Sequence, residues 1–405
     1  MPAPITLTKR RPPARPPPAI RAPRSSECDV LRPGNTWRDS SAVWPGCTIG
    51  ARLFPPACNV WSGGPKVGEH DDSSAPANAV SGNPTASTAQ RQPALASAPT
   101  AAPPKYLWLT GRLVPWHEAT VHITMIGWPA IGAVFEGIRA YWNAERQELY
   151  LFRLDEHLRR FGQSMKLMRM RPSLTLEQIR AGVLDLFRAN EVREDSYCQP
   201  LAFTGGQVWG SRATADQVPE ILITTRPSPS ALLSGRASTA GVSSWTRISD
   251  NVLPPRIKAM PNYANARLAS HEAQRHGYDV PIFLNTAGKV SESTGSCLFL
   301  VRDGVAITPP ITASILESIT RATVIELLND LGVPVQEREV DRTELYIADE
   351  LFFCGTAMEI HPVVRVDGYE VGAGMVGPIV ARLERCYHDI VRGIDRRYER
   401  WLTRV

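Results

Sequence analysis

The sequence predicts an α+β protein of two domains that follow a long disordered extension. Nineteen of the 35 prolines in the 405-residue chain lie in residues 1–104. Beyond them, segments with helical periodicity alternate with short apolar segments typical of strands. A Pro-, Ser- and Gly-rich stretch near residues 226–235 interrupts this regular part. We therefore divide the chain into an extension (1–104), a small α+β domain (105–228), an inter-domain linker (229–238), a large α+β domain (239–393) and a C-terminal tail (394–405).

The extension carries no periodic apolar face. It contains an Arg/Pro run at residues 11–18 and an Ala/Ser/Pro/Thr tract at residues 73–104. Such composition buries too little apolar surface to fold, so we expect disorder. Two other interpretations are a polyproline ligand, from the spacing of Arg10, Pro13 and Pro16, and a targeting peptide, which the prolines and the missing apolar core oppose. We favour a plain tail.

Composition narrows the class of protein. No apolar run approaches the roughly 18 residues that a membrane helix needs. The seven cysteines show neither CxxC nor Cys/His ligand spacing, so we expect no metal site and no disulfides, only reduced thiols in a cytoplasmic protein. Residues 1–104 hold 11 basic and 6 acidic side chains, whereas residues 105–405 hold 34 of each. The balanced charge of the folded part does not favour a nucleic-acid partner.

Local patterns predict the elements of the small domain. Residues 149–153 form an expected strand, after which Asp155 is expected to cap a helix that ends before Pro172. Thr175 and Gln178 have the spacing of a capping box, so a second helix should begin there. The side chains expected to face the core are Leu158, Phe161, Met165 and Met168 on the first helix and Leu176, Ile179, Val183 and Leu186 on the second.

The large domain is predicted in the same way. The pattern indicates helices at residues 263–275, before Gly277, and at residues 319–331, before Gly332. A strand is expected at residues 282–284, followed by a turn at 285–288 and a second strand that runs through Glu292. Residues 298–301 and 305–308 are expected to form a hairpin across Asp303-Gly304. A last strand is expected at residues 350–353.

Lysine is rare in this chain, with six lysines against 39 arginines. Arginine serves solubility equally well, but only a lysine amine forms a Schiff base. Lys258 lies in a loop before a helix, whereas Lys166 and Lys289 are expected to be surface charges. A single lysine would usually be a surface charge too, so the assignment of Lys258 depends on its surroundings.

Six segments around Lys258 resemble the fold-type IV pyridoxal-phosphate aminotransferases, most closely the branched-chain amino acid aminotransferases. They occur in family order over residues 105–390. The segments are Val134-Phe-Glu-Gly-Ile-Arg139, Phe152-Arg-Leu-Asp-Glu-His-Leu-Arg-Arg160, Lys258-Ala-Met-Pro-Asn-Tyr263, Val290-Ser-Glu-Ser-Thr-Gly295, Ser318-Ile-Thr-Arg321 and Ala348-Asp-Glu-Leu-Phe-Phe-Cys-Gly-Thr-Ala-Met-Glu359. The resemblance implies the two-domain fold of the D-amino acid aminotransferase type and pyridoxal 5′-phosphate as cofactor.

The resemblance also implies roles for individual residues. Lys258 would be the catalytic residue that holds the cofactor as a Schiff base and then moves a proton. Glu292 would keep the pyridine nitrogen protonated, and Tyr263 would hydrogen-bond the ring oxygen. The phosphate would contact Arg160, the helix start at Ile319 and Thr320, and Thr356. The substrate-binding residues would be Phe135, Tyr197, Gln199, Gly355 and Ala357.

The chain departs from the family on the substrate side. Where relatives place Tyr-x-Arg, this chain has Tyr197-Cys-Gln199, and a pocket tyrosine of the family is replaced by Ala130. A glutamine offers only a neutral donor, so carboxylate binding should weaken by about ten-fold and Gln199→Arg should restore it. The alternative is that another arginine supplies the missing charge from elsewhere in the fold. Trp209, in the loop at residues 205–210, could reshape the pocket.

These features predict an aminotransferase that transfers an amino group between a branched-chain or other hydrophobic L-amino acid and a 2-oxo acid such as 2-oxoglutarate. The alternatives are a D-amino acid or (R)-amine transaminase of specialised metabolism, a lyase like aminodeoxychorismate lyase, and an inactive fold whose tail binds partners. We expect a homodimer in which the loop at residues 205–210 closes the partner's site, with small-molecule substrates and neither nucleic acid nor membrane as partner.

Removal of residues 1–104 should leave fold and activity unchanged, because this stretch has no periodic apolar face and precedes the first family-like segment. Thermal unfolding and steady-state kinetics of the truncated protein test this expectation. Aggregation of the truncated protein, or loss of most of its activity, would show that the extension contributes to the fold.

Overall fold

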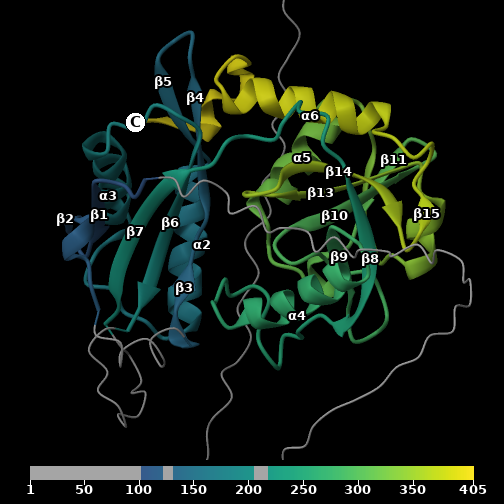
Figure 1. Ribbon diagram of the computed structural model, residues 1–405, viewed down its shortest axis with the longest axis horizontal. Coiled ribbons are helices and arrows are strands. Elements are labelled where there is room, and N and C mark those ends of the chain that lie inside the picture. Colours follow the sequence, from purple (N-terminus) through teal and green to yellow (C-terminus); the bar gives the residue numbers. More distant parts are fainter. Residues whose placement is uncertain (1–101, 122–130, 205–217) are drawn as a thin grey trace, which may run out of the picture. The chain divides into compact units, whose positions relative to one another are not determined.

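The computed structural model describes residues 102–121, 131–204 and 218–405. The extension at residues 1–101, Ala130 and the loop at residues 205–210 lie outside these residues. The described chain contains two mixed α/β parts, each built on its own β-sheet (Figure 1). This agrees with the α+β prediction. Within the described residues no helix is long and apolar enough to cross a membrane.

The first sheet has the strand order β16-β5-β4-β6-β7-β1-β2, with β3 paired to β6. Its strands are β1 (Tyr106–Leu109), β2 (Arg112–Pro115), β3 (Val134–Phe135), β4 (Ile138–Asn143), β5 (Glu148–Phe152), β6 (Ser196–Phe203), β7 (Glu220–Pro227) and β16 (Leu402–Arg404). The helices α2 (Leu154–Leu167) and α3 (Leu176–Ala189) pack on one face, and a core that includes Ile138, Phe161 and Cys198 fills the space between them and the sheet. Alternate residues of β6 are buried, so its other face is turned away from this core.

The second sheet has the order β12-β11-β10-β13-β14-β8-β9, with β15 paired to β14. Its strands are β8 (Ser238–Thr246), β9 (Val280–Leu284), β10 (Cys297–Arg302), β11 (Val305–Thr308), β12 (Val335–Glu337), β13 (Glu350–Gly355), β14 (Glu359–Val366) and β15 (Tyr369–Glu370). Helix α4 (Asn262–Arg275) contacts β8 and β9, and helices α5 (Ile319–Asp330) and α6 (Pro378–Val391) contact β13.

Several predicted boundaries are confirmed. Thr175 and Gln178 form the capping box of α3, and Ser318 caps α5 by accepting a hydrogen bond from the backbone of Arg321. The hairpin of β10 and β11 turns at Asp303-Gly304, where both residues have positive φ angles of 51° and 75°. Local side-chain and turn chemistry therefore sets these element ends.

Three other predictions, on a helix cap, a buried side chain and a strand, were wrong. Asp155 does not cap α2, because Arg153 precedes the helix with a φ of 52° and Asp155 already lies in the first turn. Leu176, the first residue of α3, is 38% exposed and lies beside Gly162 of α2. The segment through Glu292 is not a strand, since only Lys289 and Val290 make isolated bridges there.

The C-terminal residues form structure rather than a tail. A 3-10 helix at Arg396–Trp401 leads into β16, which pairs with β5 of the first sheet. Tyr398 and Trp401 are buried in the core of the second part, so the end of the chain touches both parts. This contact depends on residues about 250 positions apart in the sequence, which local patterns do not indicate.

Candidate active site

The loop that carries Lys258 follows β8 but is fastened to the first sheet. The backbone N–H of Lys258 donates to the Ser164 hydroxyl of α2 at 3.2 Å, and its carbonyl accepts from Phe135 at 2.9 Å. Met260 donates to the carbonyl of Ala133 at 2.9 Å. The loop backbone is therefore fixed by three hydrogen bonds to elements that precede it by about 100 residues.

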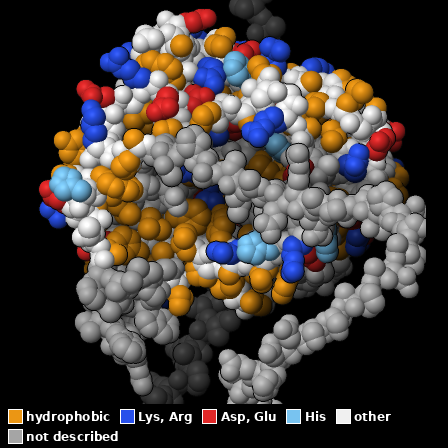
Figure 2. All heavy atoms as spheres, viewed as in Figure 1, with side chains coloured by type: hydrophobic (Ala, Val, Ile, Leu, Met, Phe, Trp, Pro, Cys, Tyr) orange, Lys and Arg blue, Asp and Glu red, His pale blue; other side chains and the backbone are white. Residues whose placement is uncertain are grey.

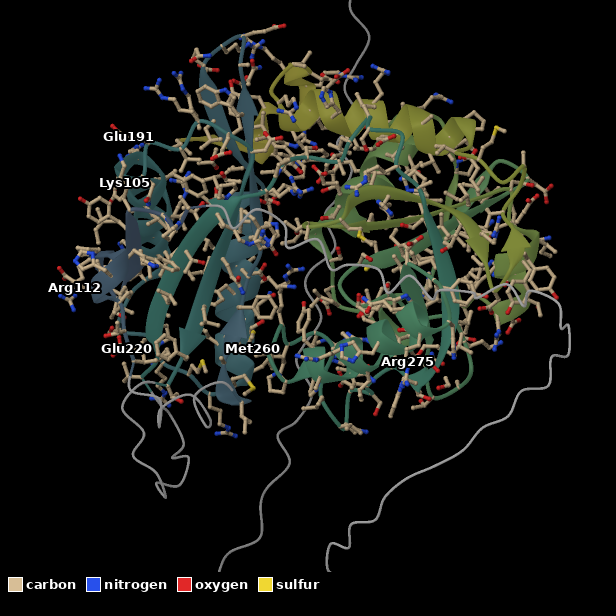
Figure 3. All side chains as sticks on the ribbon, viewed as in Figure 1. Lys105, Arg112, Glu191, Glu220, Met260 and Arg275 are labelled. Carbon is tan, nitrogen blue, oxygen red and sulfur yellow. The ribbon has the colours of Figure 1, made fainter. Side chains whose placement is uncertain are left out.

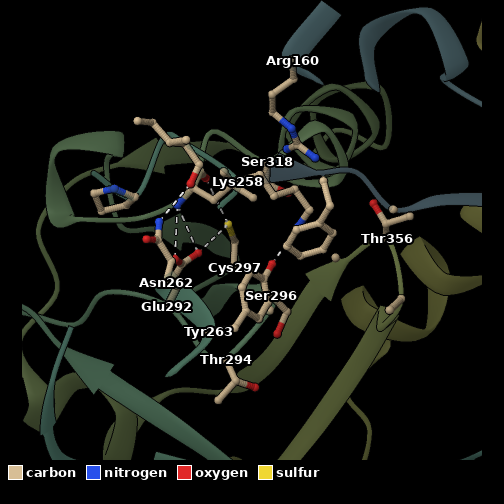
Figure 4. A pocket seen from close by; sticks show the side chains of 18 of the residues that line it. Arg160, Lys258, Asn262, Tyr263, Glu292, Thr294, Ser296, Cys297, Ser318 and Thr356 are labelled. Atoms are coloured by element: carbon tan, nitrogen blue, oxygen red, sulfur yellow. Dashed lines mark hydrogen bonds between the residues drawn. The ribbon is translucent and has the colours of Figure 1, made fainter. Parts of the chain in front are cut away.

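The Lys258 amine lies in a pocket between both sheets (Figure 4). Its Nζ donates to the Tyr263 hydroxyl at 2.8 Å and lies 4.7 Å from the centre of the Phe135 ring. Burial lowers the pKa of Lys258, but Tyr263, Glu136 and Tyr197 act against burial, and the balance raises this pKa above its ordinary value. The amine of the ligand-free chain therefore carries a proton at neutral pH.

Glu292 is a buried carboxylate in the same pocket, 3% exposed. Its Oε1 accepts from Arg247 Nη2 at 2.6 Å and from the backbone of Leu316 at 3.2 Å. Burial raises the pKa of Glu292, and the opposing charge of Arg247 does not fully offset this effect. A cation placed beside Glu292 would therefore stabilise its ionised form.

Arg247 was missing from the prediction, although it lines the pocket directly after β8. In a chain with 39 arginines no local sequence pattern distinguishes this one. Its role becomes apparent only when the fold places it against Glu292.

Arg160 is held at the other end of the pocket by Glu136. Its Nε and Nη2 donate to the two carboxylate oxygens of Glu136 at 2.7 and 2.8 Å, and its Nη1 donates to the carbonyl of Glu317 at 2.9 Å. These bonds use three of the five N–H groups of a guanidinium, so two remain for an anion. His157 also contacts Glu136, through Nδ1 at 2.8 Å.

The bond to Glu317 places Arg160 beside the start of α5, which begins at Ile319 as predicted. Backbone N–H groups in the first turn of a helix have no intrahelical partner and attract anions. Ser318 lines the pocket, whereas Ile319 and Thr320 follow it in the helix and do not line the pocket themselves. Arg160, the α5 terminus and the Thr356 turn thus gather donors on one side of Lys258.

Two glycines permit close approaches on the substrate side. A Cβ on Gly137 would lie 1.6 Å from the Tyr197 hydroxyl, so only glycine leaves room for this tyrosine. A Cβ on Gly355 would lie 2.8 Å from the carbonyl of Gly295, so the Gly355–Ala357 turn packs directly on the loop that follows Glu292.

The structure brings most of the predicted site residues together. Those that line the pocket are Phe135, Arg160, Tyr197, Lys258, Tyr263, Glu292, Gly355, Thr356 and Ala357. Gln199 lies on β6 but does not line it. The lining residues absent from the prediction include Gly137, Arg247, Asn262, Thr294, Ser296, Cys297, Leu316 and Ser318.

Glu136→Gln should lower the free energy of unfolding by about 3–5 kcal/mol, because it leaves Arg160 buried without its counter-charge. Burial alone would raise the pKa of Glu136, but Arg160 and His157 outweigh it and hold this pKa well below its ordinary value. The contribution of Glu136 to the free energy of unfolding is therefore complete above roughly pH 4.3, the pKa of a glutamate in the unfolded chain. This contribution is lost as the pH falls towards the lower pKa of Glu136 in the folded chain.

Urea denaturation of wild type and Glu136→Gln at several pH values measures this effect. The difference between their free energies of unfolding should become smaller below roughly pH 4. Glu191→Gln is the control, because the Lys105–Glu191 pair lies on the surface and should contribute little (Figure 3). Equal stability of Glu136→Gln and wild type at neutral pH would mean that this carboxylate does not hold Arg160.

Comparison with known proteins identifies the family. The model of the family described as amino-transferase class IV matches residues 133–366. A branched-chain-amino-acid aminotransferase of Escherichia coli (strain K12) is 37% identical over 304 residues, which cover 74% of this chain and 97% of that protein. The crystal structure of the branched-chain amino acid aminotransferase from Thermobaculum terrenum in PLP-form is similar with a TM-score of 0.72 and 51% identity, over 75% of this chain and 98% of that one.

A further similar structure is the T.th. branched-chain amino acid aminotransferase complexed with N-(5′-phosphopyridoxyl)-L-glutamate. Its TM-score is 0.69 at 36% identity, over 74% of this chain and 98% of that one. The family model covers more than half of the chain, and the alignments span nearly the whole of each relative. The chain therefore belongs to the class IV aminotransferases.

Proposed function

We propose that this chain is a pyridoxal-phosphate-dependent transaminase that moves an amino group between a branched-chain or other hydrophobic L-amino acid and a 2-oxo acid such as 2-oxoglutarate. The observation that carries the proposal is the pocket in which the Lys258 amine, the Glu292 carboxylate and the Arg160 guanidinium meet from separate elements. The names of the relatives support the substrate class.

The donor set of the pocket fits pyridoxal phosphate. Its phosphate is an anion that suits the two remaining N–H groups of Arg160, the α5 terminus and Thr356. A protonated ring nitrogen suits Glu292, whose raised pKa reflects a buried carboxylate that lacks full compensation. The aldehyde suits the amine of Lys258, and the similar structures in PLP-form and with a phosphopyridoxyl compound support this cofactor.

One residue of the chain transfers the proton, and its neighbours hold the reacting groups in position. When bound, pyridoxal phosphate supplies a ring that withdraws electrons from the substrate carbon. Lys258 Nζ accepts and returns the proton of that carbon, and Tyr263 orients this amine through its 2.8 Å contact. Arg247 fixes the carboxylate of Glu292, so that the negative charge of Glu292 stays where the cofactor's ring nitrogen would bind. Glu136 fixes Arg160 in the same way at the phosphate position.

Substrate binding follows from the remaining lining residues. The Phe135 ring faces Tyr263 at 5.0 Å between ring centres and offers an apolar wall to a hydrophobic side chain. Tyr197 and the backbone amides of the Gly355–Ala357 turn offer donors for a carboxylate. The relative complexed with a phosphopyridoxyl glutamate supports glutamate and 2-oxoglutarate as the second substrate pair.

Borohydride reduction of the loaded enzyme followed by peptide mapping should find the cofactor on Lys258. Lys258→Ala should abolish turnover and still bind the cofactor weakly, because Arg160 and the α5 terminus remain. Lys166→Ala is the matched control, since this lysine lies exposed on α2 and should keep full activity. A label on Lys166 or Lys289 would refute the assignment.

Measuring the first half-reaction, the transfer of the amino group from a donor to the enzyme, distinguishes this function from a D-amino acid or (R)-amine transaminase and from a lyase. Loaded enzyme is mixed with L-amino acids, D-amino acids or amines, and the cofactor absorbance is followed. A change with L-leucine and L-valine supports the proposal, whereas a change with D-amino acids or (R)-amines alone favours the specialised transaminase. Release of pyruvate without amino transfer would indicate a lyase.

We also propose a homodimer, because large apolar side chains are exposed around the Lys258 loop. Trp245, Val252, Leu253 and Met260 are 36–71% exposed, and Figure 2 shows further hydrophobic side chains gathered over the first sheet on the face in view. A second copy of the chain would remove this surface from water. Light scattering of the active enzyme should give twice the chain mass, and an active monomer would contradict the proposal.

A further inference from the structure

The short segment at residues 316–318, just before α5, contacts charged side chains at both ends of the pocket. The backbone N–H of Leu316 donates to Glu292 Oε1 at 3.2 Å. The carbonyl of Glu317 accepts from Arg160 Nη1 at 2.9 Å. The backbone of this segment therefore holds both the carboxylate expected at the cofactor ring and the guanidinium expected at its phosphate.

The side chain of Glu317 lies outside the pocket. The residues on either side of Glu317 line the pocket, whereas Glu317 does not and is exposed. Arg256 in the Lys258 loop is placed in the same way, exposed between two lining residues. The lining neighbours are Pro255 and Ile257 in the loop and Leu316 and Ser318 before α5. Two stretches of the pocket wall thus each present one charged side chain on the outer side.

An ion pair joins these two charged side chains. Arg256 Nε donates to Glu317 Oε1 at 3.1 Å. Arg256 Nη1 also donates to Asp250 Oδ1 at 2.9 Å, but Asp250 and Arg256 both belong to the loop between β8 and α4. The bond to Glu317 therefore fastens the Lys258 loop to the start of α5, whereas the bond to Asp250 stays within the loop.

The distance between these two segments matters because the cofactor is held at two points. Lys258 would bind its aldehyde carbon in one segment, and Arg160 and the α5 start would bind its phosphate beside the other. When two attachments are held at the separation that a ligand spans, a ligand released at one point is recaptured before the other lets go. A variable separation weakens this cooperation and leaves each attachment by itself unchanged.

We propose that Arg256 and Glu317 are positioning residues that set the distance between Lys258 and the phosphate-binding end of the pocket, and that their ion pair slows the loss of pyridoxal phosphate. This inference rests on the proposed function, which places the cofactor between these two attachments. The two side chains are 42% and 49% exposed, so salt screens their attraction. Retention of the cofactor should therefore depend on ionic strength.

The test measures how fast loaded enzyme loses pyridoxal phosphate in low-salt buffer, with a phosphatase present to destroy the released cofactor. Arg256→Gln and Glu317→Gln should each lose it about two- to five-fold faster than wild type, the effect of an exposed ion pair. The double variant should lose it no faster than either single variant, since both substitutions remove the same bond. The difference from wild type should disappear in about 1 M KCl, where the Debye length falls to about 3 Å.

Pyridoxal, which has no phosphate, distinguishes a change of distance from damage to the lysine. It can react with Lys258 but makes no bond at the α5 end, so its dissociation constant from the cofactor-free enzyme should be equal in wild type and all variants. Asp250→Asn is the matched control, because it removes an ion pair of Arg256 and leaves the bond to Glu317. This variant should lose pyridoxal phosphate at the wild-type rate.

Three outcomes would overturn the inference. The first is an equal rate of cofactor loss in wild type, Arg256→Gln and Glu317→Gln. The second is weaker binding of pyridoxal in the variants, since the pair would then support Lys258 itself. The third is an equal acceleration in Asp250→Asn, since the loop alone would then govern retention.

These measurements do not depend on turnover, so they are separate from the test of the proposed function. If no amino donor changes the cofactor absorbance of wild type, the proposed function is wrong. If amino donors change it and the variants retain the cofactor as wild type does, only the inference about Arg256 and Glu317 is wrong.

Discussion

The attachment of the Lys258 loop to the first sheet is the constraint on which the site depends. The loop follows β8 in the second part, yet its backbone bonds go to Ser164, Phe135 and Ala133, and Ile257 lies in the first hydrophobic core. The reactive amine therefore lies between two sheets instead of on either one. Side chains from both sheets can reach this amine only while the attachment keeps the Lys258 loop between the sheets.

Buried carboxylates in this site are each paired with an arginine. Arg160 binds Glu136 with two N–H groups, and Arg247 binds Glu292. A guanidinium matches a carboxylate with a planar fork and keeps its charge in low-dielectric surroundings, whereas a buried amine loses its proton more readily. The chain thus uses arginine for fixed charge, and Lys258 is placed where a group must exchange a proton.

The sheet row Arg139, Tyr197 and Arg226 shows how burial separates two identical side chains. Both arginines face the same tyrosine in register. Glu359 and the carbonyls of Ser228 and Pro229 surround Arg139, whereas Arg226 remains exposed on the tyrosine ring. The same residue type can therefore be buried in an ion pair that stabilises the fold in one position and remain exposed on a tyrosine ring in the other.

The sequence by itself determined what depends on neighbouring residues. The capping box at Thr175 and the cap at Ser318 are local, because hydrogen bonds within a few positions set them. Only the tertiary structure decided the pairing of Arg247 with Glu292 and the docking of β16 on β5, which join residues 45 or about 250 positions apart. Such contacts depend on how the chain folds back on itself, and no local spacing encodes them.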